Sequence, residues 1–320
     1  MNSHPHINAF ADQINDSSLE TRGGVLLLGE GCSVKAGLPD SQACLETIKS
    51  TFPEAYARAK PQDLPGCLAE LSLEERTTLL QEQVKHGKLN WAYLCIALLM
   101  QKGYIARVLT ANPDPLILQA CSLLGEFPAV YDCAATRLIR ADQAVDKSVF
   151  FLNGRSLGLT PGPLNEVFED LGASRPICVV GFPGDATGPI IQQLAQAAPY
   201  AKGLLWVQNG DAPGPEVQAI LQQENAQTVE ALDPDAFLIL LAQQLGLPMP
   251  EILQNPFSHL GQLLDSLAPF PVPGAGEELS LTDIPLANTH RAIVQFEEAG
   301  KENDFSGHGI DGLDNPDLLR

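Results

Sequence analysis

Residues 23–40, GGVLLLGEGCSVKAGLPD, constrain the fold more than any other stretch of the chain. Val25–Leu28 is a short apolar run that fits one buried strand. The following Gly29-Glu30-Gly31 allows a sharp turn and a close approach of the backbone to a ligand. Residues 33–36 then resemble one helical turn, which Gly37 ends. A strand, a glycine turn and a helix start together predict an anion site, because free N–H groups there suit a pyrophosphate.

A strand-to-helix turn without any ligand is the alternative interpretation of this stretch. Position 34 is Val, where the usual dinucleotide fingerprint has its third glycine. No Gly-Lys-Ser/Thr follows the turn, so a Walker-type phosphate loop is excluded.

Apolar runs typical of buried strands recur along the chain and alternate with helical patterns. They cover residues 25–28, 105–109, 129–131, 149–152, 176–181, 204–207 and 228–231. This alternation predicts an α/β fold, with a Rossmann-like, mostly parallel sheet and helices on both faces. Residues 41–103 show helical periodicity and no strand pattern, which predicts a small helical subdomain inserted after the first strand.

Two parts are therefore expected along the chain. Residues 1–246 form the α/β domain. Residues 247–320 are rich in proline at first and acidic at the end, which predicts a linker, short helices and a polar tail.

The charge of the chain excludes several partners. With 39 acidic and 19 basic residues the net charge is −20, which repels nucleic acid and anionic lipid. The longest apolar run, Tyr93–Met100, is far shorter than the roughly 20 residues that span a bilayer. The N-terminus lacks a signal-peptide pattern, so we expect a cytoplasmic protein. The sequence is compatible with a homo-oligomer and with a larger protein as the partner.

Several polar or glycine-rich segments directly follow the expected strands. They are Thr110–Asp114, Asn153-Gly154, Gly181–Asp185 and Asn209. The carboxyl ends of parallel strands meet at one edge of a sheet, so these segments and the glycine turn converge on a single cleft. The alternative is a set of Asx turns, with Asp114 capping the helix at 115–124 and Asn209 in a turn before Gly210.

These segments resemble the motifs of the sirtuin family. GEGCSVKAGLPD is similar to the signature Gly-Ala-Gly-x-Ser-x-x-x-Gly-Ile-Pro-Asp, and the Thr-x-Asn-x-Asp and Gly-x-Ser-x-x-Asp motifs follow in order, with Pro183 at the place of the usual Ser. The resemblance covers about residues 20–245. By pattern it is closest to bacterial sirtuin-like domains that hydrolyse NAD, often in antiphage defence proteins. It implies that NAD is bound by Gly29, Glu30, Gly31, Ser33, Gly37, Pro39, Asp40, Asn112, Gly181, Asp185 and Asn209.

The resemblance also implies the catalytic residues. Asn112 would contact the nicotinamide ribose and orient a water, and Asp114 would help to hold that loop. Asn153 occupies the place of the family's general-base His, and an amide cannot take up a proton near neutral pH.

Three classes of function follow from this pattern. The resemblance favours an NAD+ glycohydrolase that releases nicotinamide and ADP-ribose, impaired by Asn153. The alternative is an inactive NAD- or ADP-ribose-binding sensor or partner module. A dehydrogenase is disfavoured by the glycine spacing. None of the seven cysteines forms a Cys-x-x-Cys pair, so we expect no zinc module and no deacetylase activity.

Overall fold

The computed structural model describes residues 4–16, 22–135, 144–154, 167–168, 173–196, 199–208, 210, 212–230, 232–265 and 291–295. The chain divides into two compact units, Met1–Leu245 and Gly246–Arg320.

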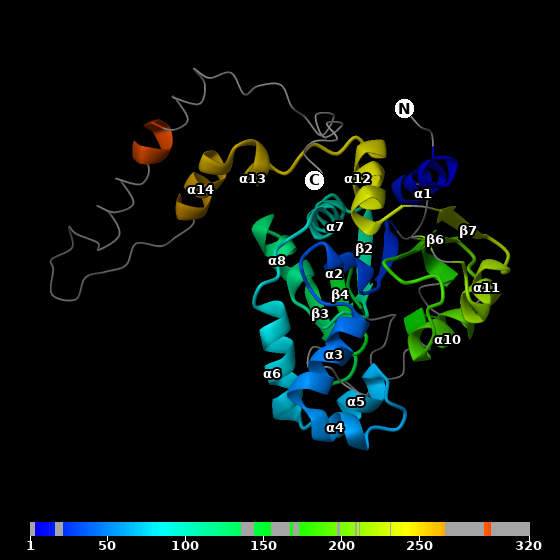
Figure 1. Ribbon diagram of the computed structural model, residues 1–320. Coiled ribbons are helices and arrows are strands. Elements are labelled where there is room, and N and C mark those ends of the chain that lie inside the picture. The colour runs from blue at the N-terminus through cyan, green and yellow to red at the C-terminus, as the bar shows by residue number, and fades with distance from the viewer. Residues whose placement is uncertain are drawn as a thin grey trace, which may run out of the picture. The chain divides into compact units, whose positions relative to one another are not determined.

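Seven strands of the first unit form one sheet in the order β3-β4-β2-β1-β5-β6-β7, and every neighbouring pair is parallel (Figure 1). The five strands between the edge strands β3 and β7 are buried along their whole length, as expected for a sheet that is covered on both faces. The predicted Rossmann-like parallel sheet is therefore confirmed. The strands are β1 (Gly24–Leu28), β2 (Ile105–Thr110), β3 (Ala129–Asp132), β4 (Ser148–Phe151), β5 (Ile177–Val180), β6 (Leu204–Gln208) and β7 (Ala226–Glu230).

Helices cover the sheet in two layers. α1 (Pro5–Asn15), α12 (Pro234–Gln244), α7 (Trp91–Gln101) and α8 (Leu116–Leu123) contact one another in that order, and α7 also contacts β2. α10 (Pro189–Gln196) and α11 (Pro215–Leu221) contact each other and share a core with alternate strand residues such as Leu27 and Val179. Successive strand residues point to opposite faces, so the two neighbours of Leu27 face the other layer.

The segment after β1 holds a small helical subdomain with a core of its own. α2 (Gly31–Val34) is followed by α3 (Ser41–Thr51), α4 (Pro53–Arg58), α5 (Leu64–Glu70) and α6 (Leu73–Val84). Helix α7, which the sequence places in the same insertion, lies instead against α8, α12 and β2. The buried core of the subdomain consists of Cys44, Ile48, Ala55, Ala59, Cys67, Leu68, Leu71 and Leu79.

The two ends of this subdomain lie side by side. The Lys88 amide donates to the Ala36 carbonyl at 2.8 Å, which joins the segment before α3 to the segment after α6. Leu38 packs against Gly87, where an added Cβ would lie 2.8 Å from the Leu38 side chain. The subdomain is thus connected to the rest of the unit through a narrow neck.

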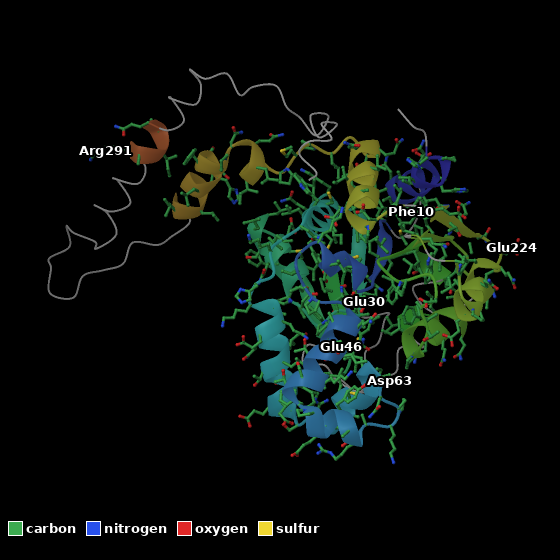
Figure 2. All side chains as sticks on the ribbon, in the orientation of Figure 1. Phe10, Glu30, Glu46, Asp63, Glu224 and Arg291 are labelled. Carbon is green, nitrogen blue, oxygen red and sulfur yellow. The ribbon has the colours of Figure 1, made fainter. Side chains whose placement is uncertain are left out.

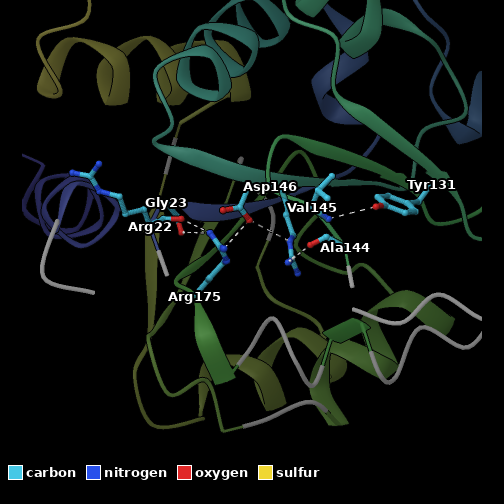
Figure 3. Close-up of polar contacts among 8 residues, drawn as sticks. Arg22, Gly23, Tyr131, Ala144, Val145, Asp146 and Arg175 are labelled. Atoms are coloured by element: carbon cyan, nitrogen blue, oxygen red, sulfur yellow. Dashed lines mark hydrogen bonds and ion pairs between the residues drawn. The ribbon is translucent and has the colours of Figure 1, made fainter. Parts of the chain in front are cut away.

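Two buried arginines meet one aspartate near the amino ends of the strands (Figure 3). Arg175 donates from Nη2 to Asp146 Oδ1 at 2.7 Å and from Nη1 to the Gly23 carbonyl at 3.4 Å. Arg107 donates from Nη2 to the Ala144 carbonyl at 2.8 Å, and its Nε lies 4.0 Å from Asp146 Oδ1. This cluster ties the start of β1 to β2 and to the segments that enter β4 and β5.

The second unit contains α13 (Glu251–Gln254) and α14 (Pro256–Asp265), which contact each other. Their exposed apolar side chains include Leu253, Phe257, Leu260 and Leu263. Within the described ranges, no helix combines the length and the apolar character that crossing a bilayer demands.

Candidate functional site

The predicted site residues follow strands that end at the same edge of the sheet. The glycine turn follows β1, Asn112 follows β2, Asn153 follows β4 and Gly181 follows β5. The chain leaves β1 for β2 on one side, and β5 lies on the other side of β1. Ligands of open α/β sheets bind at such a switch point, outside the carboxyl ends of the strands.

Glycines are required in the turn after β1 because it lies directly against the turn after β5. The amides of Gly29 and Gly31 donate to the carbonyls of Val180 and Gly181 at 2.9 and 2.8 Å. A Cβ on Gly29 would lie 2.5 Å from the Gly181 oxygen, and one on Gly31 would lie 2.9 Å from it. The close approach expected toward a ligand is therefore an approach between two backbone segments of the protein.

The amides at the start of α2 are used inside the protein. The amides of Gly31, Cys32 and Ser33 donate to the carbonyls of Gly181, Gly29 and Glu30 at 2.8, 3.2 and 2.8 Å. The sequence interpretation of an anion site depended on these N–H groups being free. That expectation is wrong, because these amides already donate to carbonyls of the protein. A diphosphate bound here would need other hydrogen-bond donors.

A buried polar network joins the loops after β1 and β2. Asn112 donates from Nδ2 to the Gly29 carbonyl at 2.9 Å and to Ser33 Oγ at 3.1 Å. Ser33 Oγ donates to Asp114 Oδ2 at 2.8 Å and lies 2.8 Å from the Tyr93 hydroxyl. All four side chains are buried. The network fixes the Asn112 amide relative to the glycine turn.

Burial sets the protonation behaviour of this network. Burial raises the pKa of the Asp114 carboxyl, although hydrogen bonds from Ser33 and from the Leu116 amide oppose the rise. Burial also raises the pKa of the Tyr93 hydroxyl well above its usual value, so that this group stays protonated and can donate. Asp114 Oδ1 accepts from the Leu116 amide at 3.0 Å, which forms an Asx turn directly before α8, whereas the N-cap of that helix is Pro115.

Sequence reasoning missed Tyr93, which belongs to α7 and reaches the network from sixty positions beyond Ser33. A second contact that the sequence did not predict joins α2 to the start of α7 and to α12. Asn90 donates from Nδ2 to the Cys32 carbonyl at 2.8 Å and to Asp235 Oδ2 at 3.2 Å. A hydroxyl within the otherwise apolar helix WAYLCIALLMQ was the available signal for Tyr93.

Asn153 lies next to the loop that carries Asn112. Its Nδ2 donates to the Ala111 carbonyl at 3.1 Å, and its side chain is half-buried. Gly154 follows with φ at 73°, and a Cβ there would lie 3.0 Å from Asp132 Oδ1. The Asn153 amide can orient a neighbouring group, but it has no proton equilibrium near neutral pH.

Other predicted binding residues have structural partners. Glu30 Oε2 accepts from the Ser41 amide at 3.0 Å, and Asp40 Oδ1 accepts from the Ala43 amide at 2.8 Å. Gly37 has φ at 83°, and Pro39 follows it before α3. Asp185 packs against Gly214, where a Cβ would lie 3.2 Å from the Asp185 Cα. Asn209 lies outside the described residues.

Among the described residues, the cysteines and the metal-ligating side chains define no further centre. All seven cysteines are buried and unpaired. Burial raises the pKa of the thiols of Cys95, Cys121 and Cys133 to about 12. In the described part of the chain no three His, Cys, Asp or Glu side chains are grouped so that they could hold a metal ion.

Fold and site together define an α/β protein of Rossmann-like topology, with a buried polar network at its switch point. No family model and no curated protein matches the chain. Among solved structures it is similar to Sir2Tm bound to a propionylated peptide, with 17% identity, 75% of this chain and 99% of that chain covered, and a TM-score of 0.44.

A Sir2 complex with a p53 peptide and NAD+ gives 18% identity, coverage of 74% and 98%, and a TM-score of 0.42. Sir2 with an inhibitor, 2′-O-acetyl-ADP-ribose and a deacetylated p53 peptide gives 21%, coverage of 75% and 99%, and 0.41. At these identities and TM-scores the likeness does not bear on function, which must be argued from the residues of the site.

Proposed function

We propose that this protein is a sirtuin-like NAD-binding domain that hydrolyses NAD+ to nicotinamide and ADP-ribose. The observation that carries the proposal is the buried Asn112–Ser33–Asp114 network beside the paired turns of Gly29 and Gly181. It lies at the edge of the sheet where α/β proteins bind nucleotides. The motif resemblance of residues 29–40 and 110–114 supports NAD as the ligand.

The chemistry asks little of the protein beyond positioning. Breaking the nicotinamide–ribose bond passes through an oxocarbenium-like state, and the enzyme must hold NAD+, place a water and exclude solvent. The Asn112 Nδ2 group donates to Gly29 and Ser33, so we assign its Oδ1 to the water or a ribose hydroxyl. Asp114 and Ser33 would keep that amide in one orientation.

Asn153 would orient a ribose hydroxyl without removing its proton. Loss of a general base typically lowers a rate by about 10²- to 10⁴-fold. We therefore expect slow hydrolysis by this chain. Following nicotinamide release from NAD+ by chromatography tests the proposal, with Asn112→Ala as the variant that should abolish turnover.

One observation favours the second candidate function, a binding module without turnover. Asn153 stands where acid–base chemistry would be needed, and its amide is committed to the Ala111 carbonyl. Calorimetric binding of ADP-ribose by a protein that releases no nicotinamide would support this module. Absence of ADP-ribose and NAD binding at millimolar concentration would contradict both candidates.

The wider setting is proposed on the motif resemblance alone. Residues 29–40 resemble bacterial NAD-hydrolysing domains of antiphage defence, which supports NAD depletion in the cytoplasm as the biological role. The absence of Cys-x-x-Cys pairs from the sequence supports a domain that works without zinc.

A further inference from the structure

Glu30 occupies the middle of the glycine turn, and its carboxylate caps the first helix of the inserted subdomain. Glu30 Oε2 accepts hydrogen bonds from the Ser41 amide at 3.0 Å and from Ser41 Oγ. Asp40 caps the same helix by accepting from the Ala43 amide at 2.8 Å. Two carboxylates therefore lie at the start of α3, beside the turn that a nucleotide would approach.

Within the described part of the chain, no basic side chain neutralises this carboxylate. Among the described residues, no Lys, Arg or His forms an ion pair with Glu30. What stabilises its charge is the N-terminus of α3, through the Ser41 amide and the positive end of the helix dipole. A diphosphate placed at the turn would meet this negative charge, and the amides of residues 31–33 could not offset it because they already donate to carbonyls of the protein.

The motif resemblance implies that Glu30 is one of the NAD-binding residues; we propose instead that its charge lowers the affinity of this site for diphosphate ligands by repulsion. The inference depends on the proposed function, because it assumes that a nucleotide diphosphate binds at the turn. Two like charges close together near a protein surface repel each other, so the Glu30 carboxylate would weaken the binding of an anionic ligand at the turn. A Gln at this position keeps the length of the side chain and an oxygen that can accept from Ser41, and it removes the charge.

The test is calorimetric titration of ADP-ribose into the wild-type protein, Glu30→Gln and Glu46→Gln at low salt. ADP-ribose is used because it lacks the nicotinamide–ribose bond that the proposed reaction would cleave. Glu46 is the matched control (Figure 2). It is exposed on α3, the helix that Glu30 caps, and its carboxylate lies 3.9 Å from the Lys49 ammonium. Replacing Glu46 with Gln changes the net charge of the protein as much as Glu30→Gln does. We expect about five- to tenfold tighter binding by Glu30→Gln and no change for Glu46→Gln. The gain in affinity of Glu30→Gln should become smaller in about 0.5 M salt, because dissolved ions screen the repulsion between exposed charges.

Ser41→Ala separates the charge from the helix cap. It removes the hydroxyl contact and keeps the Glu30 carboxylate, so it should bind ADP-ribose no more tightly than the wild type. Equal binding by the wild type and Glu30→Gln, weaker binding by Glu30→Gln, or an equal gain for both Gln variants would overturn the inference and leave the proposed function standing. No binding by any of these proteins would overturn the proposed function and, with it, the inference.

Discussion

Asn153 shows how much one side chain can decide at this site. It follows a buried strand and precedes a glycine, and its amide reaches the loop of Asn112. If the proposed hydrolysis takes place, the chemistry of this side chain decides whether a general base takes part in it.

We expect Asn153→His to raise nicotinamide release at least tenfold, equivalent to about 1.4 kcal/mol of barrier. An imidazole with an unperturbed pKa of about 6.5 is a usable base at neutral pH. Release is measured by chromatography, with Asn153→Gln as the control that keeps an amide. If Asn153→His changes nothing while Asn112→Ala abolishes the wild-type turnover, no base is needed.

Gly29→Ala should destabilise the first unit by about 3 kcal/mol, because its Cβ would meet the Gly181 backbone. Gly37→Ala is the control, since nothing lies within 4 Å of a Cβ there and the cost is that of a left-handed residue, about 1 kcal/mol. Urea unfolding measures both. Equal costs would contradict the packing role, and a large cost means that Gly29 variants cannot test ligand binding.

At the scale of elements, polar contacts decide how helices and strands are joined. The apolar runs identified the strands, and in the structure Ser72, Asn90 and Asp233 cap the starts of α6, α7 and α12. The packing partners of helix α7 are harder to predict from the sequence. The helix is apolar on all sides, so its periodicity does not indicate which element it faces. The contacts of Tyr93 and Asn90 depend on that placement and could not be predicted.

Asp146→Ala should destabilise the fold, because it leaves the buried Arg107 and Arg175 without their shared carboxylate. Asp146 is about half exposed, so the cost should lie between the 1 kcal/mol of an exposed pair and the 3–5 kcal/mol of a buried one, roughly 2 kcal/mol. Glu70→Ala, which breaks the exposed Arg58–Glu70 pair, should cost less than about 1 kcal/mol. Urea unfolding at neutral pH compares them, and equal costs would contradict the prediction.

Asp235 should make stability depend on pH. Burial raises the pKa of this carboxyl, which accepts from the Ala92 and Asn90 nitrogens at the junction of α12 and α7. Between the unfolded and the folded pKa the folded state holds the proton more tightly, so its stability falls as pH rises through that range. We therefore subtract the unfolding free energy of Asp235→Asn from that of the wild type. This difference should decrease as the pH is raised above about 4 and then become constant. A difference that is constant with pH would contradict this.

At the scale of the molecule, the parallel sheet brought Gly29, Asn112, Asn153 and Gly181 to one edge, as the strand pattern predicted. Local patterns suffice for this, because strand direction alone fixes which ends meet. The contact of the glycine turn with Gly181 was not predictable, since it joins residues about 150 positions apart. The hydrogen bonds of the Gly29 and Gly31 amides belong to the same contact between the turns after β1 and β5, whereas the Cys32 and Ser33 amides donate locally.

We expect no NAD-dependent deacylation of an acetyl-lysine peptide. The sequence holds no Cys-x-x-Cys pair from which a four-cysteine zinc module could be built. Mass spectrometry of an acetylated peptide incubated with NAD+ provides the measurement. Measurable loss of the acetyl group would contradict the prediction, whereas nicotinamide release without peptide deacylation would agree with hydrolysis alone.

The hydrogen bond between Lys88 and Ala36 has a consequence for how this protein can change over time. The loop that holds α3 to α6 is closed at its base, and the entropy of closing a loop grows only slowly with length. Helices between residues 37 and 87 could therefore be gained, lost or exchanged while the order of the strands stays the same. Because of the narrow neck, the helices of this subdomain can vary without disturbing the sheet.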